Sequence, residues 1–226
     1  MQRLCCAVLF TMLALGARAQ EAPSANERAR YDGLFAAAQA CDLPAAERAV
    51  RSGARVDARD GYERTALHVA AYARCPAVMR ALVAAGADPN ALERDRYDVV
   101  TVAAVADDLP TLDAALALGC NPRNVTSRYD GTALIAAAHL GHAAAVQRLI
   151  DAGAPLDHVN NLGWTALIES IVLGDGGPRH QATLRALVRA GANVQLADRA
   201  GVKPLALARA RSYADMVREL ERVGAR

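Results

Sequence analysis

Residues 65–90 read TALHVAAYARCPAVMRALVAAGADPN. Gly86, near the end of this stretch, is one of six glycines spaced 33 to 38 residues apart, at positions 53, 86, 119, 153, 191 and 224. Self-similarity at this period is typical of a chain built from stacked copies of one supersecondary unit. We therefore expect an elongated array, and its function should lie on the surface that the array presents.

Each copy contains two expected helices. In the stretch quoted above, the second helix places Met79, Leu82 and Val83 on one apolar stripe and ends at Gly86. Glycine there adopts the left-handed conformation at little cost, whereas other L-residues lose roughly 1–2 kcal/mol. The first helix begins at an N-cap residue, and the six expected N-caps are Asp32, Thr65, Asp98, Thr132, Thr165 and Lys203.

Two strings carry a family resemblance. Thr65-Ala66-Leu67-His68-Val69-Ala70-Ala71 resembles the T-P-L-H-x-A-A signature of ankyrin repeats, and Gly86-Ala87-Asp88-Pro89-Asn90 resembles that family's G-A-D-x-N. Gly141-His142 is similar to its inter-helix Gly-His. The resemblance implies an all-α ankyrin-repeat solenoid of about six helix-turn-helix units joined by β-hairpin-like loops. The expected repeat domain is 32–226, with units at about 32–60, 61–93, 94–126, 127–160, 161–198 and 199–226.

The N-terminus has the features of a secretory signal peptide. Arg3 precedes an apolar run from Leu4 to Leu15, and Ala17-Arg18-Ala19 offers a cleavage site. Residues 1–19 are therefore expected to be removed, although an uncleaved anchor is the alternative, and 20–31 to form a tether. Heavy alanine use and a single lysine, Lys203, suggest a GC-rich bacterial genome. We expect a periplasmic or secreted protein.

Three cysteines follow the expected cleavage site. Cys120 stands where other units have alanine, so we expect a small buried hydrophobic side chain. Cys41 and Cys75 fall in the inter-helix turns of adjacent units. An oxidising compartment permits a disulfide between them, but their Cα atoms must lie within about 7 Å. The sequence leaves open whether they pair.

The sequence contains no motif that indicates a catalytic site. The sequence lacks H-x-x-x-H and C-x-x-C metal-binding motifs, and His68 and His142 match positions whose histidines hydrogen-bond loops in ankyrin repeats. The fifth unit gains five residues between its helices, within the stretch that contains Gly174-Asp175-Gly176-Gly177-Pro178-Arg179-His180. This stretch lacks the strand and the Gly-Lys-Ser/Thr of a phosphate loop. We predict no catalytic residue, cofactor or metal.

The family resemblance implies a partner-binding surface made of loop tips and the concave face of the first helices. Mapped onto this chain, that surface combines tyrosines, arginines and the only tryptophan, which are residue types that dominate protein interfaces. The candidate partner-binding residues are Tyr62, Arg64, Tyr72, Arg94, Arg96, Tyr97, Arg128, Tyr129, His139, Trp164 and Arg199.

Protein binding by an exported monomer is the leading hypothesis, and the partner could be an enzyme for which this chain is an accessory or immunity protein. A second hypothesis is a small-molecule binder or enzyme centred on Gly174–His180. A third is nucleic-acid binding by the tip arginines. The formal charge of +2 includes Arg3 and Arg18, so the rest of the chain is about neutral, which disfavours nucleic acid and membrane surfaces as partners.

Overall fold

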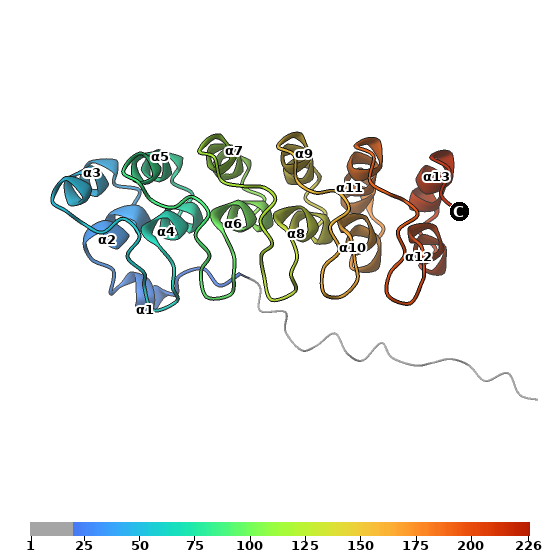
Figure 1. Cartoon of the computed structure of the whole chain (residues 1–226), viewed down its shortest axis with the longest axis horizontal. Coiled ribbons are helices and arrows are strands. Elements are labelled where there is room, and N and C mark those ends of the chain that lie inside the picture. The colour runs from blue at the N-terminus through green and yellow to red at the C-terminus, as the bar shows by residue number, and fades with distance from the viewer. Residues whose placement is uncertain (1–19) are drawn as a thin grey trace, which may run out of the picture.

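The computed structural model describes residues 20–226 as a single elongated array of helix pairs (Figure 1). The signal peptide expected at 1–19 lies outside the described residues. In Figure 1 the outer helices (α3, α5, α7, α9, α11 and α13) form one row and the inner helices (α2, α4, α6, α8, α10 and α12) form a second row, with long loops extending beyond it. The expected all-α ankyrin-repeat solenoid of about six helix pairs is confirmed.

The described residues contain a short N-terminal helix followed by six helix pairs. Each inner helix has seven residues, and each outer helix has nine except α11, which has twelve. The bounds are α1 Ala25–Arg28, α2 Gly33–Gln39, α3 Leu43–Arg51, α4 Ala66–Tyr72, α5 Pro76–Ala84, α6 Val99–Val105, α7 Leu109–Ala117, α8 Ala133–His139, α9 Ala143–Asp151, α10 Ala166–Val172, α11 Pro178–Arg189, α12 Pro204–Ala210 and α13 Ala214–Arg222.

The helices begin and end where the sequence predicts. All six expected N-caps occupy that position, and the side chains of Asp98, Thr132 and Thr165 accept a backbone N–H of the first turn. Each outer helix ends two residues before a periodic glycine, and all six of these glycines have positive φ, for example +94° at Gly86. The 33-residue period therefore reflects a left-handed residue that ends each outer helix.

Small side chains form the core between neighbouring units. Ala70, Ala104 and Ala137 on successive inner helices are fully buried, and α4 packs against α2, α5 and α6. Leu82, Leu112 and Leu149 on the outer helices are also fully buried. Alanine on the inner helices lets their backbones approach closely, while leucine fills the space beneath the outer helices. Cys120 belongs to this core, as expected, and burial raises the pKa of its thiol to about 12.

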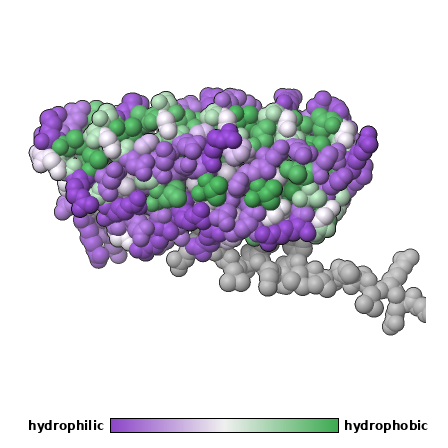
Figure 2. Space-filling model, in the orientation of Figure 1, coloured by the Kyte–Doolittle hydropathy of each residue, from purple (hydrophilic) through white to green (hydrophobic). Residues whose placement is uncertain are grey.

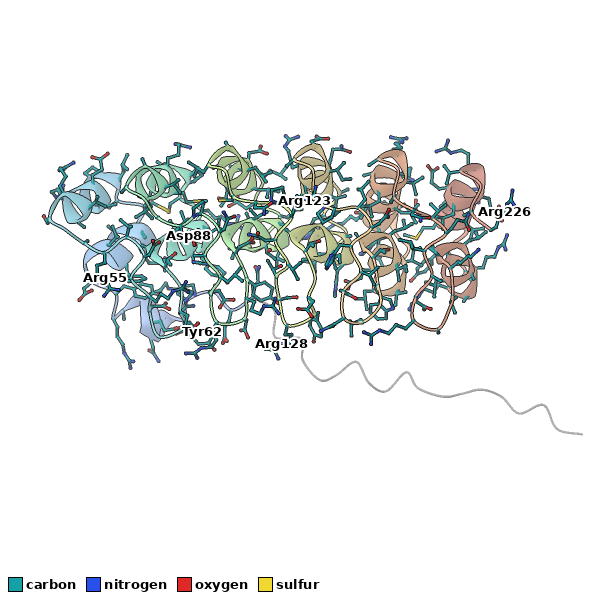
Figure 3. The ribbon with its side chains drawn as sticks, in the orientation of Figure 1. Arg55, Tyr62, Asp88, Arg123, Arg128 and Arg226 are labelled. Carbon is teal, nitrogen blue, oxygen red and sulfur yellow. A yellow bond between two sulfur atoms is a disulfide. The ribbon has the colours of Figure 1, made fainter. Side chains whose placement is uncertain are left out.

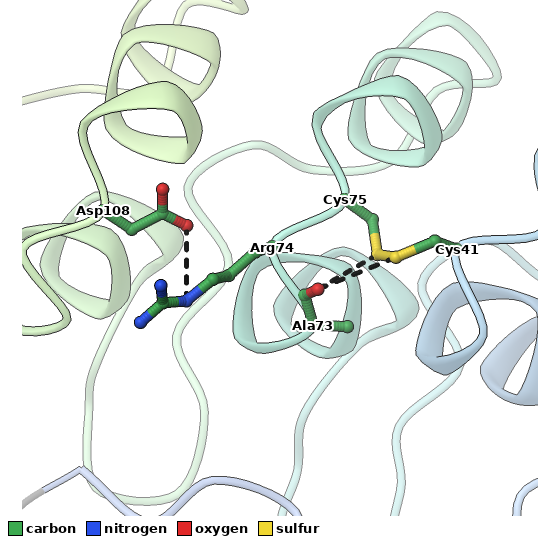
Figure 4. The surroundings of a disulfide bond; sticks show 5 residues. All are labelled: Cys41, Ala73, Arg74, Cys75 and Asp108. Carbon is green, nitrogen blue, oxygen red and sulfur yellow. Dashed lines mark hydrogen bonds and ion pairs between the residues drawn. A yellow bond between two sulfur atoms is a disulfide. The ribbon is translucent and has the colours of Figure 1, made fainter.

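The interhelical turns of the first two units are joined by a disulfide between Cys41 and Cys75 (Figure 4). Their Cα atoms lie 5.4 Å apart, within the range that a disulfide bridges. Cys41 adopts positive φ at the position that Arg74 and Gly141 take in other units, and Cys75 takes the N-cap position of α5. This one-position offset between the two cysteines turns their side chains toward each other.

The insertion in the fifth unit is packed between neighbours. It extends α11 by one turn, and the imidazole of His180 contacts both Asp175 Oδ1 at 2.8 Å and the carbonyl oxygen of His139 at 3.0 Å. The hydroxyl of Tyr213, in the sixth unit, donates to the carbonyl oxygen of Gly174 at 2.8 Å. The insertion thus connects the fourth, fifth and sixth units.

Candidate protein-binding surface

Long loops between units end in tight hairpin-like turns, each fixed by one polar side chain at its base. Asp60 Oδ1 accepts the backbone N–H groups of Tyr62 and Arg64 at 2.8 and 2.9 Å, and Asn160 Oδ1 accepts those of Leu162 and Trp164 at 3.0 and 2.9 Å. Glu93 and Asp198 occupy the same position in other units. Because these bonds fix the backbone of the turn, they also fix the positions of the Cα atoms that carry the tip side chains.

Successive tips are joined to one another. The backbone N–H of Arg94 donates to the carbonyl oxygen of Tyr62 at 3.1 Å, and that of Asn161 to the carbonyl oxygen of Tyr129 at 2.9 Å. Among the described residues the only bridge of β type is the isolated pair Thr126 and Gly131. Backbone bonds therefore link the tips of the second to fifth units, which do not assemble into a sheet.

Arginines predicted at the tips are exposed but paired across units. Arg96 Nη1 lies 2.8 Å from Asp130 Oδ1, and Arg128 Nη2 lies 3.0 Å from Asp95 Oδ1. The guanidinium of Arg94 stacks 4.6 Å above the ring centre of Tyr62. Exposed pairs of this kind contribute about 0–1 kcal/mol each, so a partner carboxylate can replace the internal one at little cost. Tyr62 and Arg128 both lie along the loop edge in Figure 3.

The structure contradicts the prediction that the Arg64 side chain is exposed. Its side chain was expected at a tip that meets a partner, but it is fully buried and forms ion pairs with Asp60 and Glu27. Although burial works against the charged form, the hydrogen bond and the charge of Asp60 raise the pKa of Arg64 above its ordinary value. Arg64 thus holds the N-terminal segment onto the second unit in this structure.

The other predicted residues differ in exposure. Tyr72 and Tyr97 are partly buried against the core, and burial raises the pKa of both hydroxyls. Trp164 is partly buried, whereas Tyr129 and Arg199 are exposed. His139 projects from the end of α8, and its Nδ1 lies 3.3 Å from Oε2 of the buried Glu169. The array thus brings Tyr129, His139 and Trp164 onto the fourth and fifth units.

Residues 20–31 pack on the array and do not form a free tether. Ser24 and Glu27 make a capping box at the start of α1. The hydroxyl of Tyr62 donates to Glu21 Oε2 at 2.7 Å, and the hydroxyl of Tyr31 donates to Asp60 Oδ2 at 2.6 Å. In Figure 1 this segment runs past the loops of the second and third units. It therefore covers part of the surface that the sequence assigns to a partner.

Most of the large exposed apolar side chains lie between the end of the third unit and the start of the fifth. Of the six large hydrophobic side chains that are exposed among residues 20–226, five lie between positions 125 and 162: Val125, Tyr129, Leu140, Val159 and Leu162. Leu162 occupies the tip position that Tyr62 and Tyr129 take in their units, so alignment of the units could have revealed it. On the face turned to the viewer, Figure 2 shows apolar patches along the array that are separated by hydrophilic side chains.

The histidines of this surface serve mainly structural contacts. His68 Nε2 lies 3.2 Å from the carbonyl oxygen of Tyr97, and its Nδ1 lies 2.9 Å from Thr65 Oγ1. Burial lowers the pKa of His68 to about 4, so it is neutral near pH 7. His142 Nδ1 contacts the carbonyl oxygen of Ala104 at 3.0 Å. Residues 20–226 contain no group of three or more His, Cys, Asp or Glu side chains arranged to hold a metal ion.

Exposed polar and apolar side chains therefore both occur along the tips and at the ends of the inner helices. Within the described part of the chain, no helix combines the length and apolar character that crossing a membrane requires.

Family models for ankyrin repeats match two parts of the chain. The model described as "Ankyrin repeats (many copies)" matches residues 50–101, and "Ankyrin repeats (3 copies)" matches residues 100–198. Together the two matches span most of the array.

Individual relatives agree with these matches. The ankyrin repeat protein YahD of Escherichia coli (strain K12) is 32% identical over 191 residues, which cover 84% of this chain and 94% of YahD. The solved ankyrin repeat domain ABAYE2397 of Acinetobacter baumannii AYE is 40% identical and has a TM-score of 0.80, covering 85% of this chain and 98% of that domain.

A more distant likeness concerns the fold alone. It is to a chain in the complex of the predatory endopeptidase Bd0816 with the immunity protein Bd3460, from Bdellovibrio bacteriovorus. The two chains are 20% identical, with a TM-score of 0.71 and coverage of 85% of this chain and 98% of that one.

Proposed function

Because this chain belongs to the ankyrin repeat family, whose domains typically bind proteins without catalysis, we propose that it is an exported, non-catalytic adaptor that binds a partner protein. The binding surface consists of the tips and inner-helix ends of the fourth and fifth units. We define this open surface as Tyr129, His139, Leu140, Leu162 and Trp164.

The observation that carries this proposal is that most of the large exposed apolar side chains among residues 20–226 occur in and around the fourth unit. Tyr129, Leu140 and Leu162 are 39%, 37% and 40% exposed. Burial of these side chains against a partner would contribute a favourable free energy of roughly 25 cal/mol per Å² of apolar area removed from water. Arg96 and Arg128 border them with weak, exchangeable ion pairs. An apolar centre surrounded by polar groups is the usual anatomy of a protein interface.

Export to the periplasm is part of the same proposal. The sequence of residues 1–19 supports it, and so does the disulfide between Cys41 and Cys75, because such bonds persist in oxidising compartments and are rare in the cytosol. A secreted or periplasmic enzyme is one class of partner that fits this location.

Site-specific photo-crosslinking in the producing cells tests the proposal. A benzophenone amino acid at Tyr129 or Leu162 should give a discrete adduct with one protein of the export compartment. The control places it at Gln147, which is exposed on the outer helix α9. Adducts from Gln147 alone, or none from either tip in folded protein, would contradict the assignment of this surface.

A further inference from the structure

The N-terminal part of the concave face already holds the chain's own residues 20–27, which are not helical up to Ser24 and enter helix α1 at Ala25. Gln20 and Ala22 line a cavity of about 250 Å³ together with Tyr72 on α4 and Val102 and Val105 on α6. Pro23 is buried. The segment thus runs from the tip of the second unit onto the inner helices of the second and third units.

Arg64 organises this contact through all three of its guanidinium nitrogens. Its Nε donates to Asp60 Oδ2 at 2.8 Å, its Nη1 donates to the carbonyl oxygen of Glu21 at 3.2 Å, and its Nη2 donates to Glu27 Oε1. Tyr62 adds a hydroxyl bond to the Glu21 carboxylate. Asp60 belongs to the array, so Arg64 would keep one partner and stay in place if the segment left, with two nitrogens then facing the groove.

Residues 20–27 are held on the array by a small number of polar contacts. Glu21, Ala22 and Ser24 are exposed, and the side-chain amide nitrogen of Gln20 is buried without a hydrogen-bond partner among the described residues. Its main polar anchors are the carboxylates of Glu21 and Glu27. A peptide of the same chemistry could make the same bonds, and its first residue could satisfy the groove better than Gln20 does.

We propose that the groove formed by Tyr62, Arg64, Tyr72, Val102 and Val105 is a second docking site, which binds an acidic segment of the partner after the chain's own residues 20–27 have left it. This proposal extends the function proposed above, because the partner would then contact both halves of the concave face. The resident segment competes with the partner, and its covalent connection gives it an effective concentration on the order of millimolar. Release of the segment therefore controls the partner's access to this second docking site.

A peptide in trans tests the docking site without knowledge of the partner. The probe is a synthetic peptide of residues 20–28 with a fluorophore at its C-terminal end, titrated with chain 20–226 and followed by fluorescence anisotropy. The variant Glu21→Ala/Glu27→Gln weakens the resident segment. It should bind the peptide about tenfold more tightly than the parent chain does, because the competing segment has lost its anchors.

Two controls make the result specific. A peptide carrying Glu21→Ala and Glu27→Gln should not bind, and a chain carrying Glu47→Gln, a change at an exposed position of α3, should behave like the parent. Circular dichroism verifies that each variant is folded. Equal affinity of the parent and the double variant, or no binding by the folded double variant, would overturn the docking site. Failure of photo-crosslinking at Tyr129 would instead count against the open surface, so the two proposals can fail separately.

Discussion

Arg64 Nε donates to Asp60 Oδ2 at 2.8 Å, and the arginine side chain is fully buried at the edge of the second unit. The same Asp60 carboxylate fixes the hairpin turn through two backbone N–H groups. Although burial acts in the opposite direction, the bonds from Tyr31 and Arg64 lower the pKa of Asp60 below its ordinary value. One ion pair therefore links the hairpin, the N-terminal segment and the array.

Replacement of Arg64 should test how strongly this pair supports the fold. Arg64→Met leaves Asp60 and Glu27 without their cation, and removal of one member of a buried pair costs about 3–5 kcal/mol. Arg96→Met is the matched control, because its pair with Asp130 is exposed and should change the free energy of unfolding by less than about 1 kcal/mol. Urea unfolding monitored by circular dichroism measures both. Equal losses of unfolding free energy in the two variants would show that the buried Arg64 pair stabilises the fold no more than the exposed Arg96 pair.

The disulfide should stabilise the first two units. Cys41 and Cys75 are 34 positions apart, and a loop of this length corresponds to about 3–4 kcal/mol in the chain-entropy treatment. Reduction of the parent should lower its free energy of unfolding by about this amount. The variant Cys41→Ala/Cys75→Ala should be insensitive to reductant. A titration of unfolded, unreduced chain 20–226 that detects three free thiols, where the structure leaves only Cys120 free in that range, would contradict the bond.

His68 should make stability depend on pH. Its pKa is about 4 in the folded chain and ordinarily 6.5, because burial disfavours the imidazolium. The unfolded state therefore binds a proton first as pH falls, and stability is full above pH 6.5 and declines progressively until about pH 4. Between pH 7 and pH 5 the parent should lose about 2 kcal/mol. The variant His68→Gln removes this titration, so an unchanged loss in that variant would assign the effect to other groups.

The left-handed glycines should be sensitive to substitution for conformational reasons alone. A Cβ atom at Gly86 would have no neighbour within 4 Å, yet its φ of +94° disfavours any L-side chain. Gly86→Ala should therefore destabilise the chain by about 1 kcal/mol. Gly61 is the control, because it has the same free space and no positive φ. Thermal unfolding of the two variants compares them directly, and a Gly86→Ala melting temperature equal to that of Gly61→Ala would refute the strain.

The sequence predicts the fold well because the signals for it are local and repeated. Glycine spacing, N-caps such as Thr165 and stripes such as that of Met79, Leu82 and Val83 each depend on residues within one unit. Six copies in register make each individual signal stronger. The structure adds the packing of residues 20–28 on the array, the extra turn of α11 and the absence of strands in the loops of the described residues.

The candidate surface was harder to predict because exposure depends on contacts between distant residues. Repeat position predicts Arg64 at an exposed tip, but its side chain is buried and pairs with Glu27, 37 residues earlier in the chain. In the same way, Tyr62 and Tyr72 lie beside residues 20–22, which the sequence describes only as a tether. The position of a residue in the repeat predicts where its backbone lies. It does not predict whether a segment outside the repeats covers its side chain.

The affinity of the photo-crosslinked partner for two variants tests the central claim most directly. Tyr129→Ala should weaken binding in isothermal titration calorimetry by about 2 kcal/mol, or roughly thirtyfold, if this exposed aromatic residue anchors the partner. Arg148→Ala, on the outer helix α9, should leave the affinity unchanged. Unchanged affinity for folded Tyr129→Ala, or a loss confined to Arg148→Ala, would contradict recognition through the concave side of the array.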